Sequence, residues 1–304
     1  MNTAVVFLKP HAANAKCAAL IEGRFAEAGV QVVSKGSVGG AAIDAEKLVD
    51  QHYGTLATAA MTSTGAELEL SDERKAAFEA LYGVPWAAAR KITNPAAMAE
   101  LSINGVQLEA VWRKGKDFKI APGTYLAELT GNGLQGRTWT VNGFYLGMRE
   151  EFVSPTACVN YYVVQFDMHK TSWASFRGGF IGATEPSEAV AGSVRRACML
   201  SWEELGLATK PSKACNCVHA SAGPLEALKE RIVWAGHALE TDSVGAALLE
   251  ANVPLETLQE WMAENPVVEV GSLGKGKIFD ITEGLDTADM LLAFGAAFAP
   301  ARAK

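Results

Sequence analysis

Apolar runs and segments of helical periodicity alternate along the N-terminal part of the chain. Residues 5–8 form an apolar run typical of a buried strand, and residues 13–28 repeat apolar side chains at helical spacing before Gly29, which favours a helix C-terminus. The pattern then predicts a strand over residues 30–38 and a helix over residues 44–61. This part of the chain is therefore expected to fold as strand, helix, strand, helix.

Strand patterns return in the second half of the chain. Residues 161–166 predict a third strand, and residues 215–218 predict a last one. The order of elements is that of a ferredoxin-like βαββαβ sandwich, in which helices cover an antiparallel sheet. We therefore expect an α+β protein whose core comprises residues 1–61 and 142–236.

The expected core is interrupted by residues 62–141 and followed by residues 237–304. The inserted segment carries recurrent apolar anchors such as Phe78, Trp86 and Trp112, so we expect a mainly helical lobe of several short helices. The C-terminal segment is expected to be a helical extension that packs on the core or forms an interface. Its apolar spacing predicts helices around residues 246–249, 255–263 and 287–298.

The composition is that of a globular protein with a sizeable core. Of 304 residues, 49% are hydrophobic and 20% are charged, and the formal net charge of −7 disfavours a main role in binding nucleic acid. The five cysteines are odd in number and scattered, so neither a disulfide framework nor a structural zinc site is expected. Neither a targeting segment nor a membrane-spanning run is evident, so a cytoplasmic protein without membrane contact is expected.

The segment from Asn216 to Ser221 carries the most specific chemistry in the chain. It contains the pattern N-x-x-H-x-S, and Glu230 and Trp234 follow His219 at eleven and fifteen positions. This pattern resembles the active-site signature of nucleoside diphosphate kinases. The resemblance implies that His219 carries a phosphoryl group while Glu230 and Ser221 orient its ring. A lone histidine is more often a buried core residue whose hydrogen bonds are made within the protein, but the matching Asn216, Ser221 and Glu230 favour catalysis.

Further motifs similar to those of the family follow in the family's order. Lys9 ends the first strand, as the family's phosphate-contacting lysine does, and Tyr53 maps onto a tyrosine beside the catalytic histidine. Phe144 matches the aromatic residue on which the base stacks, and Met148 matches its apolar neighbour. By this resemblance, the insertion at 62–141 lies within the family's nucleotide-binding hairpin.

Two arginines and an amide complete the resemblance. Arg177 and Thr184 lie in a segment similar to the family's Arg...Gly-x-Thr-x-Pro, and Arg195 ends a Gly-Ser-Val-Arg segment similar to its Gly-Thr-Ile-Arg. Planar guanidinium groups suit phosphate oxygens. The family resemblance implies that the phosphates and the 3′-side oxygen of a nucleotide are held by Lys9, Arg177, Thr184, Arg195 and Asn216.

Three acidic positions of the family are absent here. Two examples are His11, where the family has the aspartate of Lys-Pro-Asp, and Ala222, where it has the aspartate of His-Gly-Ser-Asp. These departures, with the insertion and the extension, leave open a non-enzymatic scaffold or interaction module in a larger assembly. A kinase with an acceptor other than a nucleoside diphosphate is also left open.

The resemblance predicts a nucleoside diphosphate kinase. Such an enzyme passes the γ-phosphoryl group of ATP to nucleoside diphosphates in a ping-pong cycle through a phosphohistidine, here on His219. Mg²⁺ is expected to arrive with the nucleotide, and no residue is predicted to be a dedicated metal ligand. A homo-oligomer is expected, and the oligomeric state itself is left open.

Overall fold

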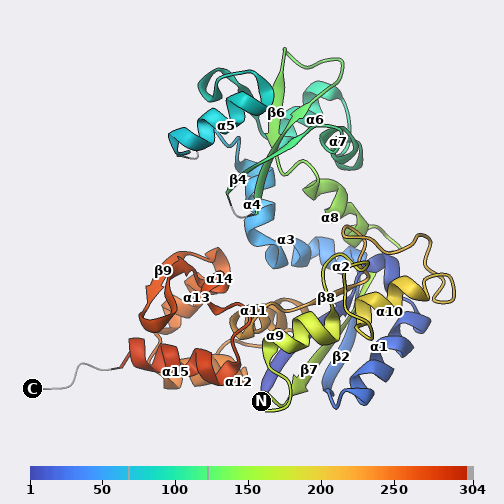
Figure 1. Cartoon of the computed structure of the whole chain (residues 1–304), viewed down its shortest axis with the longest axis vertical. Helices are drawn as coiled ribbons and strands as arrows, with labels where there is room; N and C mark the ends of the chain where they lie inside the picture. The colour runs from blue at the N-terminus through green and yellow to red at the C-terminus, as the bar shows by residue number, and fades with distance from the viewer. Residues whose placement is uncertain (68, 122, 300–304) are drawn as a thin grey trace, which may run out of the picture. The chain divides into compact units, whose positions relative to one another are not determined.

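The chain divides into two units in the computed structural model, which describes residues 1–67, 69–121 and 123–299 (Figure 1). The first unit comprises Met1–Leu48 and Pro155–Lys304, and the second unit comprises Val49–Ser154. Within the described ranges, no helix is both long and apolar enough to cross a membrane.

A four-stranded antiparallel sheet forms the centre of the first unit. Its strands follow the order β2-β7-β1-β8, which is the order of a ferredoxin-like βαββαβ fold and confirms the predicted α+β class. Every residue of the inner strand β1 is buried, because neighbours cover both of its edges and helices cover both faces. The strands are β1 (Asn2–Leu8), β2 (Gln31–Gly39), β7 (Cys158–Phe166) and β8 (Val218–Ala220).

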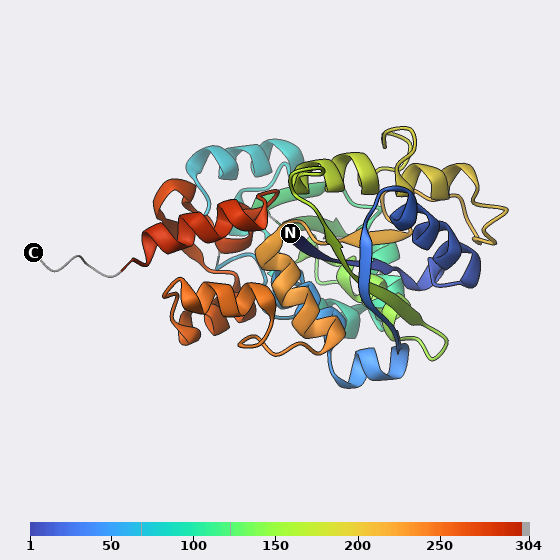
Figure 2. The same cartoon turned by 90° about the horizontal axis from the view of Figure 1, so that it is seen from below.

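Helices cover the two faces of this sheet in the way that strand alternation dictates. Ala4, Val6 and Leu8 share an apolar cluster with α1 (Ala15–Glu27) and α10 (Val194–Leu200). Phe7 points to the other face, where the centroid of its ring lies 5.2 Å from that of the Trp234 ring on α11 (Pro224–Ala235). Figure 2 shows α1 and α11 on different sides of the strands.

Two elements differ from the predicted ones at residues with positive φ. The helix expected over residues 44–61 is broken into α2 (Gly40–Ala45), α3 (Leu48–His52) and α4 (Gly54–Thr62), and Lys47 has a φ of 54° at the first break. The last strand was expected over residues 215–218 but spans Val218–Ala220. Cys217 has a φ of 67°, which is incompatible with an extended strand.

The C-terminal extension shares an apolar core with α11. Leu248, Trp261 and Phe294 belong to one buried cluster together with Leu225 and Leu228 of α11. The three predicted helices are present, whereas the hairpin β9–β10 was not predicted, and residues 300–304 of the predicted extension lie outside the described residues. The elements are α12 (Ser243–Glu250), α13 (Leu255–Glu264), β9 (Val267–Val270), β10 (Gly274–Lys277), α14 (Ile278–Thr282) and α15 (Thr287–Ala297).

The second unit contains a sheet that the sequence analysis did not predict. Its strands follow the order β3-β6-β5-β4 and are β3 (Arg90–Ile92), β4 (Asp117–Ala121), β5 (Thr124–Leu129) and β6 (Thr138–Val141). The predicted short helices of the inserted segment are also present, as α5 (Asp72–Tyr82), α6 (Asn94–Leu101) and α7 (Gly105–Trp112). The inserted segment thus contains helices and a mixed sheet, and α8 (Tyr145–Val153) follows it.

Candidate functional site

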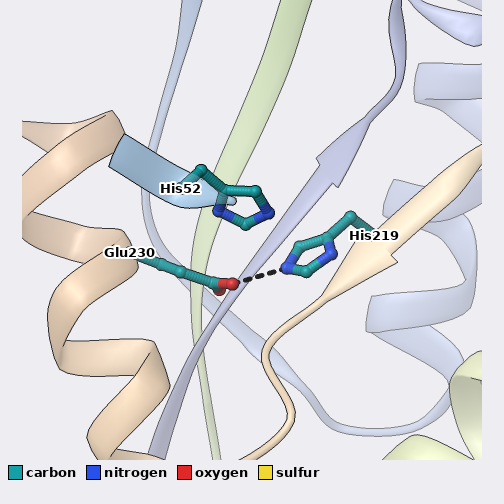
Figure 3. Close-up of side chains that lie close together, drawn as sticks. All are labelled: His52, His219 and Glu230. Atoms are coloured by element: carbon teal, nitrogen blue, oxygen red, sulfur yellow. Dashed lines mark hydrogen bonds and ion pairs between the residues drawn. The ribbon is translucent and has the colours of Figure 1, made fainter. Parts of the chain in front are cut away.

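His219 is hydrogen-bonded to a buried carboxylate. Its Nε2 lies 2.6 Å from Oε1 of Glu230, whose side chain is only 2% exposed (Figure 3). The other carboxylate oxygen, Oε2, accepts a hydrogen bond from Ser221 Oγ at 2.6 Å. One glutamate therefore joins the histidine and the serine that the sequence motif predicted.

Local chain geometry brings these three side chains together. His219 lies on β8 opposite Phe7 of β1, and the two rings stack with their centroids 4.5 Å apart. After Ser221 the chain turns into α11, which starts at Pro224 and returns Glu230 to the histidine. Ser221 is fixed in turn, because its Oγ accepts from the backbone N–H of Val5 at 2.8 Å.

The surroundings of His219 keep its imidazole neutral. Burial lowers the pKa of His219 well below its usual range, and the positive charges of Lys9, Arg195 and Arg177 lower it further. A neutral ring beside a carboxylate carries its proton on the nitrogen that faces the carboxylate, so Nε2 donates to Glu230. The lone pair of the ring is then on Nδ1.

His219 lines a cavity of about 560 Å³ in the first unit. Six of the predicted site residues lie on its wall and come from four segments that are separated in the sequence. They are Lys9, Arg177, Thr184, Arg195, Asn216 and His219. Three basic side chains therefore share one cavity with a neutral imidazole, an arrangement suited to an anionic ligand.

Arg195 and Asn216 are held by backbone groups at the cavity wall. The Arg195 guanidinium donates to the carbonyl of Val218, at 2.9 and 3.1 Å, and to that of Gly182, at 2.9 Å. Asn216 Nδ2 donates to the Thr184 carbonyl at 3.1 Å. Its Oδ1 is buried and has no hydrogen-bond partner among the described residues. A buried acceptor of this kind is costly unless a donor reaches it.

Two charged residues of the cavity wall were not predicted from the sequence, Glu226 and Glu283. Burial raises the pKa of Glu226 to about 8, with a further contribution from the charge of Glu230, so its carboxyl is largely neutral at pH 7. Glu226 lies four positions before Glu230 on the same helix, so both side chains lie on one face. This spacing could have indicated from the sequence that Glu226 lies near the site. Glu283 comes from the C-terminal extension and forms an ion pair with Arg177. No sequence signal pointed to it.

The other three predicted residues belong to the second unit. The Tyr53 ring contacts those of His52 and Phe152, with centroids 4.3 and 6.4 Å apart. The Phe144 ring packs against Trp112 at 5.3 Å, and Met148 packs in an apolar cluster around Tyr145. Tyr53 as an orienting residue, and Phe144 and Met148 as contacts of the base, stay predictions.

Comparison with solved structures finds distant neighbours, among them nucleoside diphosphate kinases. A nucleoside diphosphate kinase from Encephalitozoon cuniculi is 15% identical, with 78% of this chain and 90% of that one covered and a TM-score of 0.37. A nucleoside diphosphate kinase from Pyrobaculum aerophilum is 17% identical, with 77% and 94% covered and a TM-score of 0.36.

A nucleoside diphosphate kinase family protein from Babesia bovis is 14% identical, with 81% and 98% of the two chains covered and a TM-score of 0.36. Neither a family model nor a curated protein matches the chain. The likeness to these solved structures is a distant one, and it is a likeness of fold.

Proposed function

We propose that the protein transfers the γ-phosphoryl group of ATP to a nucleoside diphosphate through a phosphohistidine on His219. The observation that carries the proposal is the chain of hydrogen bonds from His219 through Glu230 to Ser221, next to a cavity that also holds Lys9 and Arg195. A neutral imidazole with a carboxylate on one nitrogen is a nucleophile at the other.

In the first step, Nδ1 attacks the γ-phosphorus of ATP. A bond forms between Nδ1 and phosphorus, the bond between phosphorus and the bridging oxygen breaks, and ADP leaves with that oxygen. The phosphorylated ring gains positive charge, which the Glu230 carboxylate stabilises through Nε2–H. In the second step, a terminal oxygen of a nucleoside diphosphate attacks the same phosphorus, the N–P bond breaks, and the neutral ring is restored.

The basic groups of the cavity are proposed to hold the phosphates. Lys9, Arg177 and Arg195 would neutralise oxygens whose charge rises as the phosphoryl group moves. Thr184 would lie at the β-phosphate. Asn216 would accept a hydrogen bond from a sugar hydroxyl, because its buried Oδ1 has no partner among the described residues.

Magnesium is proposed as an ion of the nucleotide and not as a ligand of the chain. Three carboxylates lie at or next to the cavity, and each is engaged: Glu230 by His219 and Ser221, Glu283 by Arg177, and Glu226 by the backbone N–H of Ala222. The raised pKa of Glu226 also makes that carboxyl a weak ligand for Mg²⁺ at neutral pH. We therefore assign no residue to the ion.

Labelling with γ-³²P-ATP tests the proposal. The purified protein is expected to take up label that is acid-labile and alkali-stable, as a phosphoramidate is, and to lose it when CDP, GDP or UDP is added. His219→Asn should abolish the label, and His169→Asn should not, because His169 is an exposed histidine that does not line the cavity. An unlabelled wild-type protein that binds ATP, or equal labelling of the His219 variant, would contradict the proposal.

A further inference from the structure

The C-terminal extension forms part of the cavity wall. Glu283 and Gly284 line the cavity, although they lie far along the chain from the histidine motif. The backbone N–H of Gly284 donates to the carbonyl of Ala222 at 2.9 Å. A side chain at Gly223 would lie 2.6 Å from the Thr282 carbonyl oxygen, so the extension passes directly over the turn that follows β8.

Asp286 fixes this part of the extension to the segment that carries Arg177. Its Oδ1 accepts from the backbone N–H of Trp173 and from Asn2 Nδ2, both at 2.7 Å. Asn2 Oδ1 in turn accepts from the backbone N–H of Thr287 at 2.8 Å. Trp173 begins the helical segment that continues through Arg177, so Glu283 and Arg177 stand on segments that are fixed to each other.

The contact between Arg177 and Glu283 uses one end of the guanidinium. Nη1 of Arg177 lies 2.5 Å from Oε1 of Glu283, and the structure records no partner for Nε or Nη2 among the described residues. The two side chains are 37% and 46% exposed. An ion pair this exposed contributes little to fold stability. The ion pair instead fixes where the guanidinium lies.

We propose that Glu283 is a positioning residue of the phosphate site. By holding Nη1 of Arg177, it keeps the Nε and Nη2 donors at the cavity wall for a phosphate oxygen of the ligand. A long flexible side chain that is ordered before binding loses less entropy when the ligand arrives. Solvent screens the exposed carboxylate, which limits its repulsion of an incoming phosphate. The inference rests on the proposed function only in taking a phosphate as the ligand.

Binding measurements on the full chain test this role. Dissociation constants for ADP and for inorganic pyrophosphate are measured by calorimetry on the wild type, Glu283→Ala and Glu283→Gln. We expect about three- to ten-fold weaker binding for Glu283→Ala, the range that ordering one such side chain gives. Glu283→Gln should stay within about two-fold, because its amide oxygen still accepts from Nη1. Glu260→Ala, at an exposed glutamate of the same extension, should not change binding.

A double-mutant cycle with Arg177→Ala shows whether the effect passes through that arginine. In the Arg177→Ala background, Glu283→Ala should cause no further loss. Tighter binding by Glu283→Ala, unchanged binding, or an equal loss in both backgrounds would each overturn the proposal. If Glu283→Ala lowers the melting temperature, Glu283→Asp is used in its place. The aspartate side chain is one methylene shorter, so its carboxylate oxygen lies farther from Arg177 Nη1 and binding should also weaken.

The two probes separate this inference from the proposed function. A wild-type protein that binds pyrophosphate but not ADP would refute the nucleotide assignment, and the Glu283 variants would still be compared with pyrophosphate. Failure of the wild type to bind either probe would refute both. Weak pyrophosphate binding by Glu283→Ala with normal binding by Glu283→Gln supports the positioning role, whatever the outcome of the labelling experiment.

Discussion

Arg231 and Asp242 form a two-point ion pair inside the first unit. Arg231 Nε lies 2.6 Å from Asp242 Oδ2 and Nη2 lies 2.7 Å from Oδ1, and the side chains are 1% and 2% exposed. Arg231 also donates to the Thr3 carbonyl at 2.7 Å. Burial raises the pKa of Asp242, but the hydrogen bonds and charge of Arg231 outweigh it and bring that pKa to about 2. The pair thus joins the helix of Glu230 to β1 and to the C-terminal extension.

Removing one partner of this pair should destabilise the fold strongly. Asp242→Ala leaves the Arg231 charge buried without its partner, and we expect a loss of about 3–5 kcal/mol in the free energy of unfolding. Glu27→Ala, which breaks an exposed ion pair with Arg24, should change it by less than about 1 kcal/mol. Urea denaturation of both variants measures the difference. Equal midpoints would show that the buried pair contributes no more than the surface pair.

Glu230→Gln should slow phosphorylation of His219 and preserve the fold. The amide oxygen can still accept from Nε2–H, and its NH₂ group can face Ser221, so the hydrogen bonds remain while the negative charge is lost. We expect a fall of about 10²-fold in the single-turnover rate, the typical size of such a contribution. Glu250→Gln, at an exposed position on α12, is the matched control. A rate equal to that of the wild type would exclude charge stabilisation by Glu230.

Ligand binding should weaken as the pH rises through about 8 because of Glu226. Its carboxyl is neutral below that pH and ionises above it, which adds a negative charge to a cavity that also holds Glu283 and lies next to Glu230. Arg177 is the basic group that partly opposes this change. Calorimetry with ADP from pH 6.5 to 9 is expected to show the decline in the wild type. The same titration of Glu226→Gln should be flatter, and identical profiles would refute the assignment.

The same group should make fold stability depend on pH. The folded-state pKa of Glu226 is above its ordinary value. The stability that the protonated carboxyl contributes to the fold is therefore fully present below about pH 4.5 and is lost as the pH rises through about 8. Between pH 5 and 9, the melting temperature of Glu226→Gln should therefore rise relative to that of the wild type. A constant difference in melting temperature over this range would contradict the prediction.

Gly147 allows α7 to approach α8 closely within the second unit. A Cβ at this glycine would lie 2.8 Å from Cβ of Glu109 on α7. Gly147→Ala should therefore cost about 1–3 kcal/mol of stability through overpacking. Gly23 is a helical glycine on α1 with nothing within 4 Å of an added Cβ, and Gly23→Ala should stabilise by about 0.5–1 kcal/mol. Shifts of the same sign in the two melting curves would contradict this prediction.

The sequence predicted six residues of the cavity wall because they belong to short motifs. His219, Ser221 and Glu230 follow from one pattern, and the structure places Lys9, Arg177 and Arg195 on the same wall. These motifs were recognised by their resemblance to those of nucleoside diphosphate kinases, and the residue order within each motif was sufficient for that comparison.

Other features depend on contacts that no local pattern encodes. The boundary of β8 depends on the positive φ of Cys217, whose N–H donates to His11 Nε2 at 3.2 Å. The sheet of the second unit is built from short strands whose pairing is set by tertiary packing. Glu283 reaches the cavity through long-range contacts, among them the hydrogen bonds of Asp286 and Gly284 that bind the extension to the core.

The place of β1 in the sheet also has a kinetic consequence. Ser221 and Val5, which together fix the site, are 216 positions apart in the chain. Closing so long a loop is entropically costly, and proteins rich in such distant contacts fold slowly. The histidine site therefore cannot form during early synthesis, and β1 has to wait for β7 and β8 to emerge. In refolding experiments, nucleotide binding should recover only in the slowest phase, after most helical structure has returned.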